Sequence, residues 1–337
     1  MIKHIYFYYE FIGIGGIVLS RILVTGGAGF IGSHLVDELL SRGYYVRVID
    51  NLSSGSLRNI QHHMGEKNFD FVKGDLKNID DINNSLKDID AVFHLAANPE
   101  VRLSTTSPEI HFRENIVATF NLLEAIRRNG GVKVLVFASS STVYGDPQII
   151  PTPETHEIRP ISVYGASKAA CESLICSYAH LYGFKALSLR YANIVGPRLN
   201  HGVIYDFILK LKRNPEILEV LGDGTQKKSY LYVKDAVDAT LYVFERINKT
   251  YDVYNIGNED WITVREIAEI VAEAMGVTPR IIYSGGTPDG RGWPGDVKYM
   301  LLSIDKLKKL GWKPKYSSRE AVKLTANALV REIIAGQ

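Results

Sequence analysis

Three glycines, Gly26, Gly29 and Gly32, separate an apolar run from an amphipathic one, and this turn limits the possible folds more than any other feature of the chain. The apolar run before the turn, Arg21–Thr25, predicts a buried strand. The residues after it, 30–42, predict a helix. Where a strand passes into a helix without intervening side chains, backbone amides can approach an anion, which the positive end of the helix favours. The turn therefore predicts a phosphate-binding strand–turn–helix unit.

Asp50 closes the next predicted strand, Tyr44–Ile49, and lies eighteen residues after Gly32. A carboxylate at this place accepts hydrogen bonds from the adenosine ribose of a dinucleotide and repels a 2′-phosphate. The first arginine after it is Arg58, so no guanidinium in the seven residues that follow Asp50 would attract that phosphate. The sequence therefore predicts a dinucleotide site that prefers NAD to NADP.

The N-terminal half continues as an alternation of apolar runs and helical patterns. Near-continuous apolar strands separated by helices are typical of a parallel sheet that is covered on both faces. The predicted fold class is α/β, a doubly wound, Rossmann-like parallel sheet with a smaller α/β C-terminal lobe for the substrate. The further strands expected are Phe69–Lys73, Ala91–Leu95, Val132–Ala138 and Ala186–Tyr191, and the further helices are Ile79–Leu86, Ile110–Arg128 and Tyr164–Tyr182.

Proline and glycine become frequent after Tyr191, which favours turns and loops that can wrap a ligand. We expect three parts: an N-terminal extension over 1–20, an NAD-binding domain over 21–192 to which 226–250 returns, and a substrate lobe over most of 193–337. The cleft between two such lobes is the usual place for a small substrate.

Composition argues against several functions. The 39 basic and 37 acidic residues nearly balance, and no block of like charge occurs, which argues against nucleic acid as a partner. The two cysteines, Cys171 and Cys176, lie on different faces of one predicted helix, without other metal-ligating residues nearby. We interpret them as packed thiols of a protein in a reducing, cytoplasmic compartment, and we expect no metal site.

Residues 1–20 are apolar, with Lys3 near the start and Glu10 interrupting the run. The segment leads directly into the strand Arg21–Thr25, and no small-residue cleavage site follows it, which argues against a signal sequence. Three interpretations stay open: a loosely held or mis-started extension, an extra packed segment, and a membrane-surface anchor. We expect no stable association with a membrane.

A tyrosine and a lysine stand four residues apart at Tyr164 and Lys168, in a helix-favouring segment. Four helical residues advance about 6 Å, which leaves the two side chains on neighbouring turns. Tyr230 and Lys234 have the same spacing, but their segment alternates like a strand, and four strand residues advance about 13 Å. We therefore expect that only Tyr164 and Lys168 act together. The ammonium and a positive nicotinamide ring could lower the tyrosine pKa by the roughly 3 units needed to take a proton from a sugar hydroxyl.

A serine run, Ser139-Ser140-Ser141, follows the predicted strand Val132–Ala138. Hydroxyls at the carboxyl end of a central strand face the crevice where ligands bind in doubly wound folds. A serine run is by itself more often a turn. Because it precedes Tyr164 by about two dozen residues, we interpret it as a hydrogen-bond partner of a sugar hydroxyl.

Together these segments resemble the extended short-chain dehydrogenase/reductases and, within that group, the UDP-glucose (UDP-galactose) 4-epimerases. The resemblance runs from Arg21 to near the C-terminus and leaves 1–20 outside. The motifs that carry it are 25–32 (TGGAGFIG), 50–52 (DNL), 74–76 (GDL), 94–97 (HLAA), the serine run, 164–168 (YGASK) and 190–193 (RYAN).

The resemblance implies a role for each residue of a larger set. Ser140 matches the catalytic Ser/Thr of the group, Tyr164 its base, and Lys168 the residue that activates the base. The implied NAD contacts are Gly26, Gly29, Phe30, Ile31, Gly32, Asp50, Asn51, Ser54, Gly55, Asp75, Leu76, Leu95, Ala96, Ala97, Asn115, Tyr164, Lys168 and Tyr191. The implied contacts of a UDP-sugar are Ser140, Ser141, Tyr164, Asn193, Val203, Lys228, Arg291 and Asp296. Relatives usually carry arginine in place of Lys228, so we expect Arg291 to be the better diphosphate ligand.

Ser141 and Thr142 bear on the type of reaction. The resemblance implies that 4,6-dehydratases carry an Asp–Glu pair at these two positions and that UDP-glucuronate decarboxylases keep the glutamate. Serine and threonine are not acids or bases near neutral pH, so we expect C4 epimerisation through a transient 4-keto sugar with recycled NAD. An epimerase of UDP-N-acetylhexosamine or UDP-glucuronate is the alternative, with Tyr299 and Met300 as the gate for an N-acetyl group.

A rival of another class is a non-catalytic dinucleotide-binding regulator or RNA-binding module. It predicts a broken Tyr–Lys pair or a basic face, and the sequence has neither feature. The resemblance also implies a homodimer formed through the helices Ile110–Arg128 and Tyr164–Tyr182.

Overall fold

Seven strands form one sheet in the order β13-β8-β7-β6-β3-β4-β5, and each neighbouring pair is parallel. The computed structural model describes residues 13–14 and 17–334. The strands of this sheet are β3 (Arg21–Thr25), β4 (Tyr45–Asp50), β5 (Phe69–Lys73), β6 (Ala91–His94), β7 (Val134–Ser140), β8 (Lys185–Tyr191) and β13 (Tyr251–Ile256). The doubly wound, parallel fold expected from the sequence is confirmed.

The strand order reverses between β3 and β6. From β3 the chain adds β4 and β5 on one side and then crosses back to add β6, β7 and β8 on the other. In open parallel sheets, ligands bind outside the carboxyl ends of the strands at such a reversal. The fold therefore places the binding crevice next to the glycine turn.

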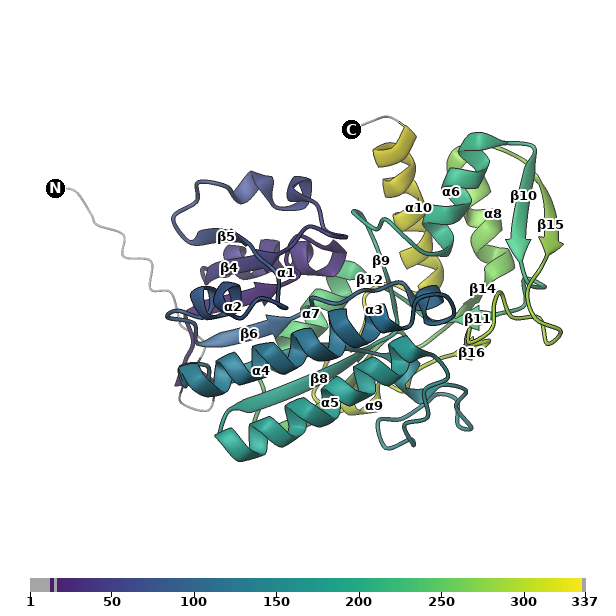
Figure 1. Cartoon of the computed structure of the whole chain (residues 1–337). Helices are drawn as coiled ribbons and strands as arrows, with labels where there is room; N and C mark the ends of the chain where they lie inside the picture. The colour runs from purple at the N-terminus through teal and green to yellow at the C-terminus, as the bar shows by residue number, and fades with distance from the viewer. Residues whose placement is uncertain (1–12, 15–16, 335–337) are drawn as a thin grey trace.

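Helices cover both faces of the sheet (Figure 1). On one face, α1 (Phe30–Ser41) contacts α7 (Val233–Phe244); on the other, α4 (Ala118–Asn129) contacts both α2 (Ile79–Ser85) and α5 (Val163–Tyr182). An apolar core lies between the sheet and the helices on each face. Successive residues of β3 pack into the two cores alternately, since Ile22 and Val24 belong to one core and Leu23 to the other. This alternation of fully buried residues is typical of a parallel sheet between two helical layers.

The helix expected over Ile110–Arg128 consists of three parts. Residues Glu109–His111 form α3, Phe112–Val117 form a π-helical stretch, and α4 follows. The wider turn contains Asn115, which is 2% exposed. Its side chain accepts a bond from the Asn98 amide at 2.9 Å and donates to Ser167 Oγ at 2.9 Å. π-helical turns of this kind are frequent at functional sites.

A serine caps the start of helix α5, and a glycine ends it. The Ser162 side chain accepts a bond from the Gly165 amide at 3.0 Å, and the helix ends at Gly183, whose φ of 77° is in the left-handed region. Cys171 is buried, as expected of a packed thiol, whereas Cys176 is partly exposed, and both are free. The capped N-terminus fixes the first turn of α5, which carries Tyr164.

The second lobe has its own apolar core, built around three helices that Figure 1 shows apart from the large sheet. These helices are α6 (Val203–Arg213), α8 (Val264–Met275) and α10 (Ser318–Ile334). The smaller sheets here pair β10 (Ile217–Leu221) with β15 (Arg280–Ser284), β9 (Asn193–Val195) with β12 (Tyr230–Tyr232), and β11 (Lys227–Lys228) with both β14 (Ile262–Thr263) and β16 (Tyr299–Met300). The short helix α9 (Asp305–Lys309) contacts β13.

The segment that returns to the first domain comprises α7 and β13, residues 233–256, whereas the sequence pointed to 226–250. β13 was not among the expected strands. It pairs with β8 from Ala186↔Tyr251 to Tyr191↔Ile256 and so forms one edge of the large sheet. Its pattern of half-buried and buried residues reflects that edge position, which local sequence does not reveal.

The start of the chain leads into β3 through a short pairing of β1 (Gly13–Ile14) with β2 (Ile17–Val18), which are antiparallel. Leu19 is fully buried, and the Ser20 amide and hydroxyl both donate to Asp90. The rest of the expected extension lies outside the described residues. In the part of the chain that the structure describes, no helix is both long and apolar enough to span a bilayer.

Candidate active site

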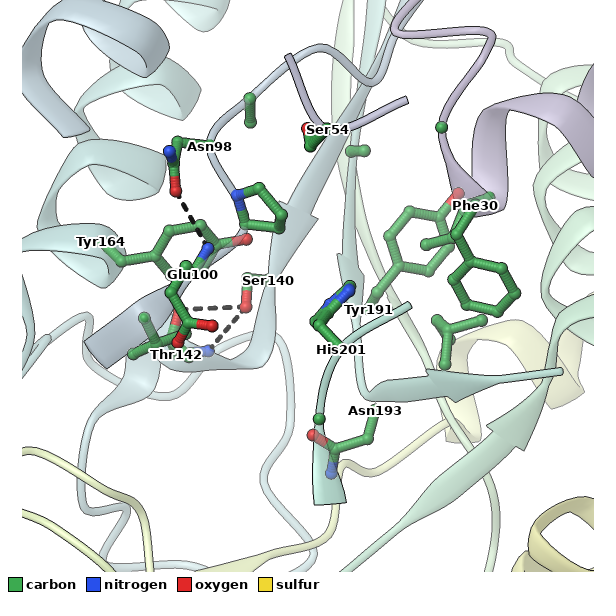
Figure 2. A pocket seen from close by; sticks show the side chains of 18 of the residues that line it. Phe30, Ser54, Asn98, Glu100, Ser140, Thr142, Tyr164, Tyr191, Asn193 and His201 are labelled. Carbon is green, nitrogen blue, oxygen red and sulfur yellow. Dashed lines mark hydrogen bonds between the residues drawn. The ribbon is translucent and has the colours of Figure 1, made fainter. Parts of the chain in front are cut away.

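One cavity of about 750 Å³ runs along the carboxyl ends of the sheet strands and into the second lobe. Figure 2 shows side chains from both domains around it, with Phe30 and Ser54 near the glycine turn, Tyr164 and Ser140 on another wall, and Asn193 and His201 from the second lobe. Every residue expected to contact NAD lines the cavity except Asn115, and every residue expected to contact the sugar nucleotide lines it except Arg291. Asn115 lies behind the wall, where it holds Asn98 and Ser167.

The glycine turn is packed too closely for side chains. Gly26 has a φ of 69°, and a Cβ at this residue would lie 2.7 Å from the Ala96 nitrogen; a Cβ at Gly32 would lie 2.2 Å from the Gly26 oxygen. The first turn of α1 carries no acidic residue, and Gly29 provides no side-chain cap. The amides at this helix N-terminus are therefore free to bind phosphate. This geometry fits the pyrophosphate of NAD.

Asp50 is buried at the end of β4 and lines the cavity. Its Oδ2 accepts a bond from the Ala28 amide at 3.0 Å, and its Oδ1 accepts from the Leu52 amide at 2.8 Å. Burial raises the pKa of Asp50, and these two amides partly offset the effect. The amides fix the carboxylate, and its remaining lone pairs suit the ribose hydroxyls that the sequence predicts as its ligands.

Asp50→Ser is expected to weaken binding of NAD and to raise the affinity ratio of NADP to NAD by at least about tenfold, which corresponds to about 1.4 kcal/mol. The change removes both the acceptor for the ribose hydroxyls and the charge that repels a 2′-phosphate. Calorimetric titration with each cofactor measures the ratio. Asp70→Ser is the control, because Asp70 lies on the neighbouring strand β5 and pairs with Arg47 outside the cavity. An unchanged ratio in Asp50→Ser would show that other residues select the cofactor.

Tyr164 and Lys168 lie one turn apart on α5, and both line the cavity. Lys168 is 3% exposed, and its ammonium donates to the Ala138 carbonyl at 2.8 Å and lies 5.9 Å from the centre of the Tyr164 ring. The second pair with this spacing is divided between elements, since Tyr230 lies on β12 and Lys234 on α7. The structure therefore brings Tyr164 and Lys168 together as expected.

In the protein alone, burial is the main influence on the Tyr164 phenol, and the expected joint effect of the Lys168 ammonium and a nicotinamide ring stays a prediction. Burial raises the pKa of Tyr164 to about 12, and the Ser140 side chain lowers it only in part. Burial also lowers the pKa of Lys168 to about 8. Desolvation disfavours the charged form of each group, and the Lys168 ammonium donates its hydrogen bond to the Ala138 carbonyl.

All three serines of the run line the cavity, but the hydroxyls of Ser139 and Ser140 have different partners. Ser140 lines the cavity, and its Oγ accepts bonds from Thr142 N at 3.2 Å and Thr142 Oγ1 at 3.0 Å, as the dashed lines in Figure 2 show. Ser139 also lines the cavity, but its hydroxyl donates to the buried carboxylate of Glu172. That bond leaves Ser140 as the better placed of the two hydroxyls for a sugar oxygen.

The expected order of the two candidate diphosphate ligands stays a prediction, and carboxylates engage both side chains. Arg291 lies outside the cavity lining, and its guanidinium bonds to Asp289 at 2.6 Å and Asp146 at 2.9 Å. Lys228 lines the cavity, with its ammonium 2.5 Å from Asp296 Oδ1 and 5.5 Å from the centre of the Trp293 ring. Asp289 is two residues from Arg291 in the same loop, whereas Asp146 comes from a distant part of the chain, so the local motif does not reveal the second pairing.

Two further residues at the site escaped the sequence analysis. Glu100 lines the cavity, and its carboxylate accepts a bond from the Arg102 amide at 3.2 Å. His111 is fully buried with its ring edge-on to Tyr164 at a centroid distance of 5.6 Å, and neither ring nitrogen has a hydrogen-bond partner among the described residues. Both residues are more than fifty positions from Tyr164 in the sequence, so no local pattern connects them with it. His111 is four residues before Asn115, and this spacing could have indicated that the two residues share one helix.

The two residues expected to gate an N-acetyl group point in different directions. Met300 is buried and lines the cavity. Tyr299, its neighbour on β16, is outside the lining and packs near Trp261 at a centroid distance of 6.4 Å. Of the two, only Met300 can therefore limit the space for a sugar substituent in this conformation.

The fold and the site define a class: a doubly wound α/β protein with a phosphate-binding turn, a ribose-binding carboxylate and a Tyr–Lys pair is an extended short-chain dehydrogenase/reductase. The sequence pattern of the NAD dependent epimerase/dehydratase family matches residues 22–257. The chain belongs to this family, and it is therefore an NAD-dependent enzyme.

Three known proteins illustrate the similarity. A putative UDP-glucose 4-epimerase of Methanocaldococcus jannaschii is 36% identical over 311 residues, which cover 91% of this chain and 97% of that protein. UDP-glucuronic acid decarboxylase 3 of Arabidopsis thaliana is 35% identical over 314 residues, covering 90% and 87%. A crystal structure of a UDP-galactose 4-epimerase is 53% identical and superposes with a TM-score of 0.83, covering 93% of this chain and 99% of that one.

Proposed function

We propose that this protein interconverts UDP-glucose and UDP-galactose by inverting C4 of the sugar with recycled NAD. One observation carries the proposal: Tyr164, Lys168 and Ser140 meet at the carboxyl end of β7, in the same cavity as the glycine turn. A base, a hydroxyl and a cofactor site in one cavity are the groups that oxidation of a secondary alcohol requires. The similarity to 4-epimerases of UDP-sugars supports the choice of substrate.

In this proposal Tyr164 accepts the proton of the C4 hydroxyl, and Ser140 holds the same oxygen by a hydrogen bond. Lys168, anchored on the Ala138 carbonyl, provides a positive charge beneath the phenol. Bound NAD supplies a reversible hydride acceptor at C4 and a positive ring charge that favours the phenolate, which burial alone disfavours. The 4-keto sugar then turns within the cavity, and Tyr164 returns the proton to the epimeric alcohol.

The end of β7 favours epimerisation over elimination. Ser141 and Thr142 stand where an acid–base pair would be needed, and both line the cavity without a titratable group. Glu100 is a carboxylate in the same cavity, but it faces Arg102, with Oε1 3.7 Å from Nε. We therefore assign Glu100 no proton transfer. Epimerisation that survives in Glu100→Gln would agree with this assignment, and its loss would show that the carboxylate takes part in the chemistry.

The decisive assay incubates UDP-galactose with purified protein, with and without added NAD, and measures UDP-glucose. Formation without added NAD is expected if the cofactor stays bound through each cycle, and formation only with added NAD would mean that it dissociates. Absence of UDP-glucose under both conditions would contradict the proposal. Parallel reactions with UDP-N-acetylglucosamine and UDP-glucuronate test the alternative substrates, and a faster reaction with either would reassign the enzyme.

A homodimer through α4 and α5 is part of the same proposal. Large apolar side chains are exposed there, including Phe120 at 44% and Leu181 at 72%. Phe120→Glu is expected to convert the dimer to a monomer, because a charge would have to be buried in the interface. Light scattering after size exclusion measures the mass. Leu324→Glu, on the exposed side of α10, is the control that should stay dimeric. A wild-type monomer, or a dimer in both variants, would contradict the assignment.

A further inference from the structure

Three side chains converge outside the cavity, on the side of the first domain where α1 meets the β4–β5 connection. Asp37 lies on α1, and His62 and His63 form a short helical turn in the connection. Asp37 Oδ1 is 3.0 Å from His62 Nε2 and 2.9 Å from His63 Nε2. One ligand atom from each residue lies within 4.8 Å of the other two. Three potential ligand atoms are therefore close together.

The hydrogen-bonding capacity of His63 singles this cluster out. Its Nε2 faces Asp37 and its Nδ1 lies 2.8 Å from Glu66 Oε1, so both ring nitrogens face carboxylate oxygens. A neutral imidazole has one N–H, so it can donate to only one of the two carboxylates. A protonated His63 would donate to both carboxylates, and a cation among the two Nε2 atoms and Oδ1 would also remove the conflict. His63 would then donate Nδ1–H to Glu66 and offer its Nε2 lone pair to the ion, the usual carboxylate–histidine–metal arrangement.

We propose that Asp37, His62 and His63 bind a divalent transition-metal ion of the Zn²⁺ type, with Glu66 as the partner that orients His63. The sequence analysis expected no metal, because these residues come from segments that the sequence does not bring together. Two imidazoles and one carboxylate suit Zn²⁺ better than Mg²⁺ or Ca²⁺, which prefer oxygen ligands. Tetrahedral Zn²⁺ separates its ligand atoms by about 3.3 Å. The two Asp37–histidine distances, 3.0 and 2.9 Å, are within a few tenths of an ångström of that value.

The charges around the cluster permit a cation. Arg198 lies 2.9 Å from Asp37 Oδ2, so it occupies the carboxylate oxygen that the proposed ion does not use. The two negative charges of Asp37 and Glu66 outnumber the single positive charge of Arg198, so the cluster keeps a net negative charge for a cation. The His63 side chain is 12% exposed and that of His62 is 47% exposed, which leaves solvent access for a water as fourth ligand.

The bound ion would connect the β4–β5 connection to helix α1. The same connection carries Ser54 and Gly55, which line the cavity next to the glycine turn. An ion that joins these segments fixes the wall of the proposed adenosine site without touching the reacting sugar. The role assigned to the metal is therefore structural, and it does not depend on which sugar the enzyme uses.

The test uses tag-free protein that has been treated with a chelator and dialysed at neutral pH. Calorimetric titration with Zn²⁺ is expected to give one equivalent per chain and to raise the melting temperature, because the ion binds the folded state. Asp37→Asn and His62→Ala should each weaken Zn²⁺ binding by at least about tenfold, and Glu66→Gln by about 10- to 100-fold. The melting temperature of each variant without metal shows whether it folds.

His180→Ala is the matched control. His180 is an exposed histidine whose Nδ1 lies 3.9 Å from the Cys176 sulfur, so the two residues are a competing pair of Zn²⁺ ligands. The His180→Ala variant should bind Zn²⁺ as the wild type does. Absence of saturable binding to the wild type would overturn the proposal and leave a hydrogen-bonded histidine cluster. So would binding that persists in folded Asp37→Asn and His62→Ala, or that disappears in His180→Ala.

Discussion

Replacing Tyr164 with phenylalanine is expected to lower the turnover of UDP-galactose by about 10²- to 10⁴-fold, because the enzyme loses the group that accepts and returns the hydroxyl proton. Phenylalanine keeps the ring that packs edge-on against His111, so the cavity wall should keep its shape. Affinity for NAD should change little, since the glycine turn and Asp50 are untouched. Initial rates at saturating substrate and a calorimetric titration with NAD measure the two quantities separately.

Tyr182→Phe is the matched control for this substitution. Tyr182 ends the same helix α5 and is exposed, far from the cavity lining. The control should turn over as the wild type does. A rate for Tyr164→Phe within a few fold of the wild type would contradict the assigned mechanism, because no other side chain has been assigned to take the proton.

The sequence predicts the relative position of Tyr164 and Lys168, but it does not predict the surroundings that set the pKa of Tyr164. The four-residue spacing places Tyr164 and Lys168 on adjacent turns, and helix geometry alone predicts this. The Ala138 carbonyl that binds the Lys168 ammonium comes from β7, thirty residues earlier. Burial of both groups likewise depends on the assembled crevice. Local geometry was therefore predictable, whereas the electrostatic effect depended on tertiary contacts.

The glycine turn and Asp50 were predictable because their function depends on segments close in sequence. A strand, a turn and a helix fold as one unit, and Asp50 ends the strand that pairs with β3. Arg291 shows the opposite case. Its loop contains Asp289 and Asp296, but Asp146 comes from another part of the chain. Glu100 is similar, since its place in the cavity depends on the arrangement of β6 beside β7. β13 was missed for the same reason, because its partner β8 lies about sixty residues away.

Glu172→Ala is expected to lower the free energy of unfolding by about 3–5 kcal/mol, the usual cost of removing one partner from a buried ion pair. Glu172 and Arg190 are 4% and 5% exposed in their side chains and lie 2.7 Å apart. Burial would lower the pKa of Arg190, but the Glu172 carboxylate outweighs it and the pKa is raised. In the variant the guanidinium would keep Tyr144 as a partner but no counter-charge. Chemical denaturation measures the change.

The exposed pair of Glu273 on α8 and Lys323 on α10 provides the control, because Glu273→Ala breaks a solvent-exposed ion pair and should leave the free energy of unfolding nearly unchanged. The double variant Glu172→Met with Arg190→Met tests the cause. If an unpaired buried charge is responsible, removing both charges should restore much of the stability that Glu172→Ala loses, since apolar replacement of a buried pair is often neutral. A double variant less stable than Glu172→Ala would show that Ser139 and Tyr144, which bond to this pair, depend on it for their own positions. Ser139 is adjacent to the proposed catalytic Ser140, so that result would link the ion pair to the geometry of the active site as well as to stability.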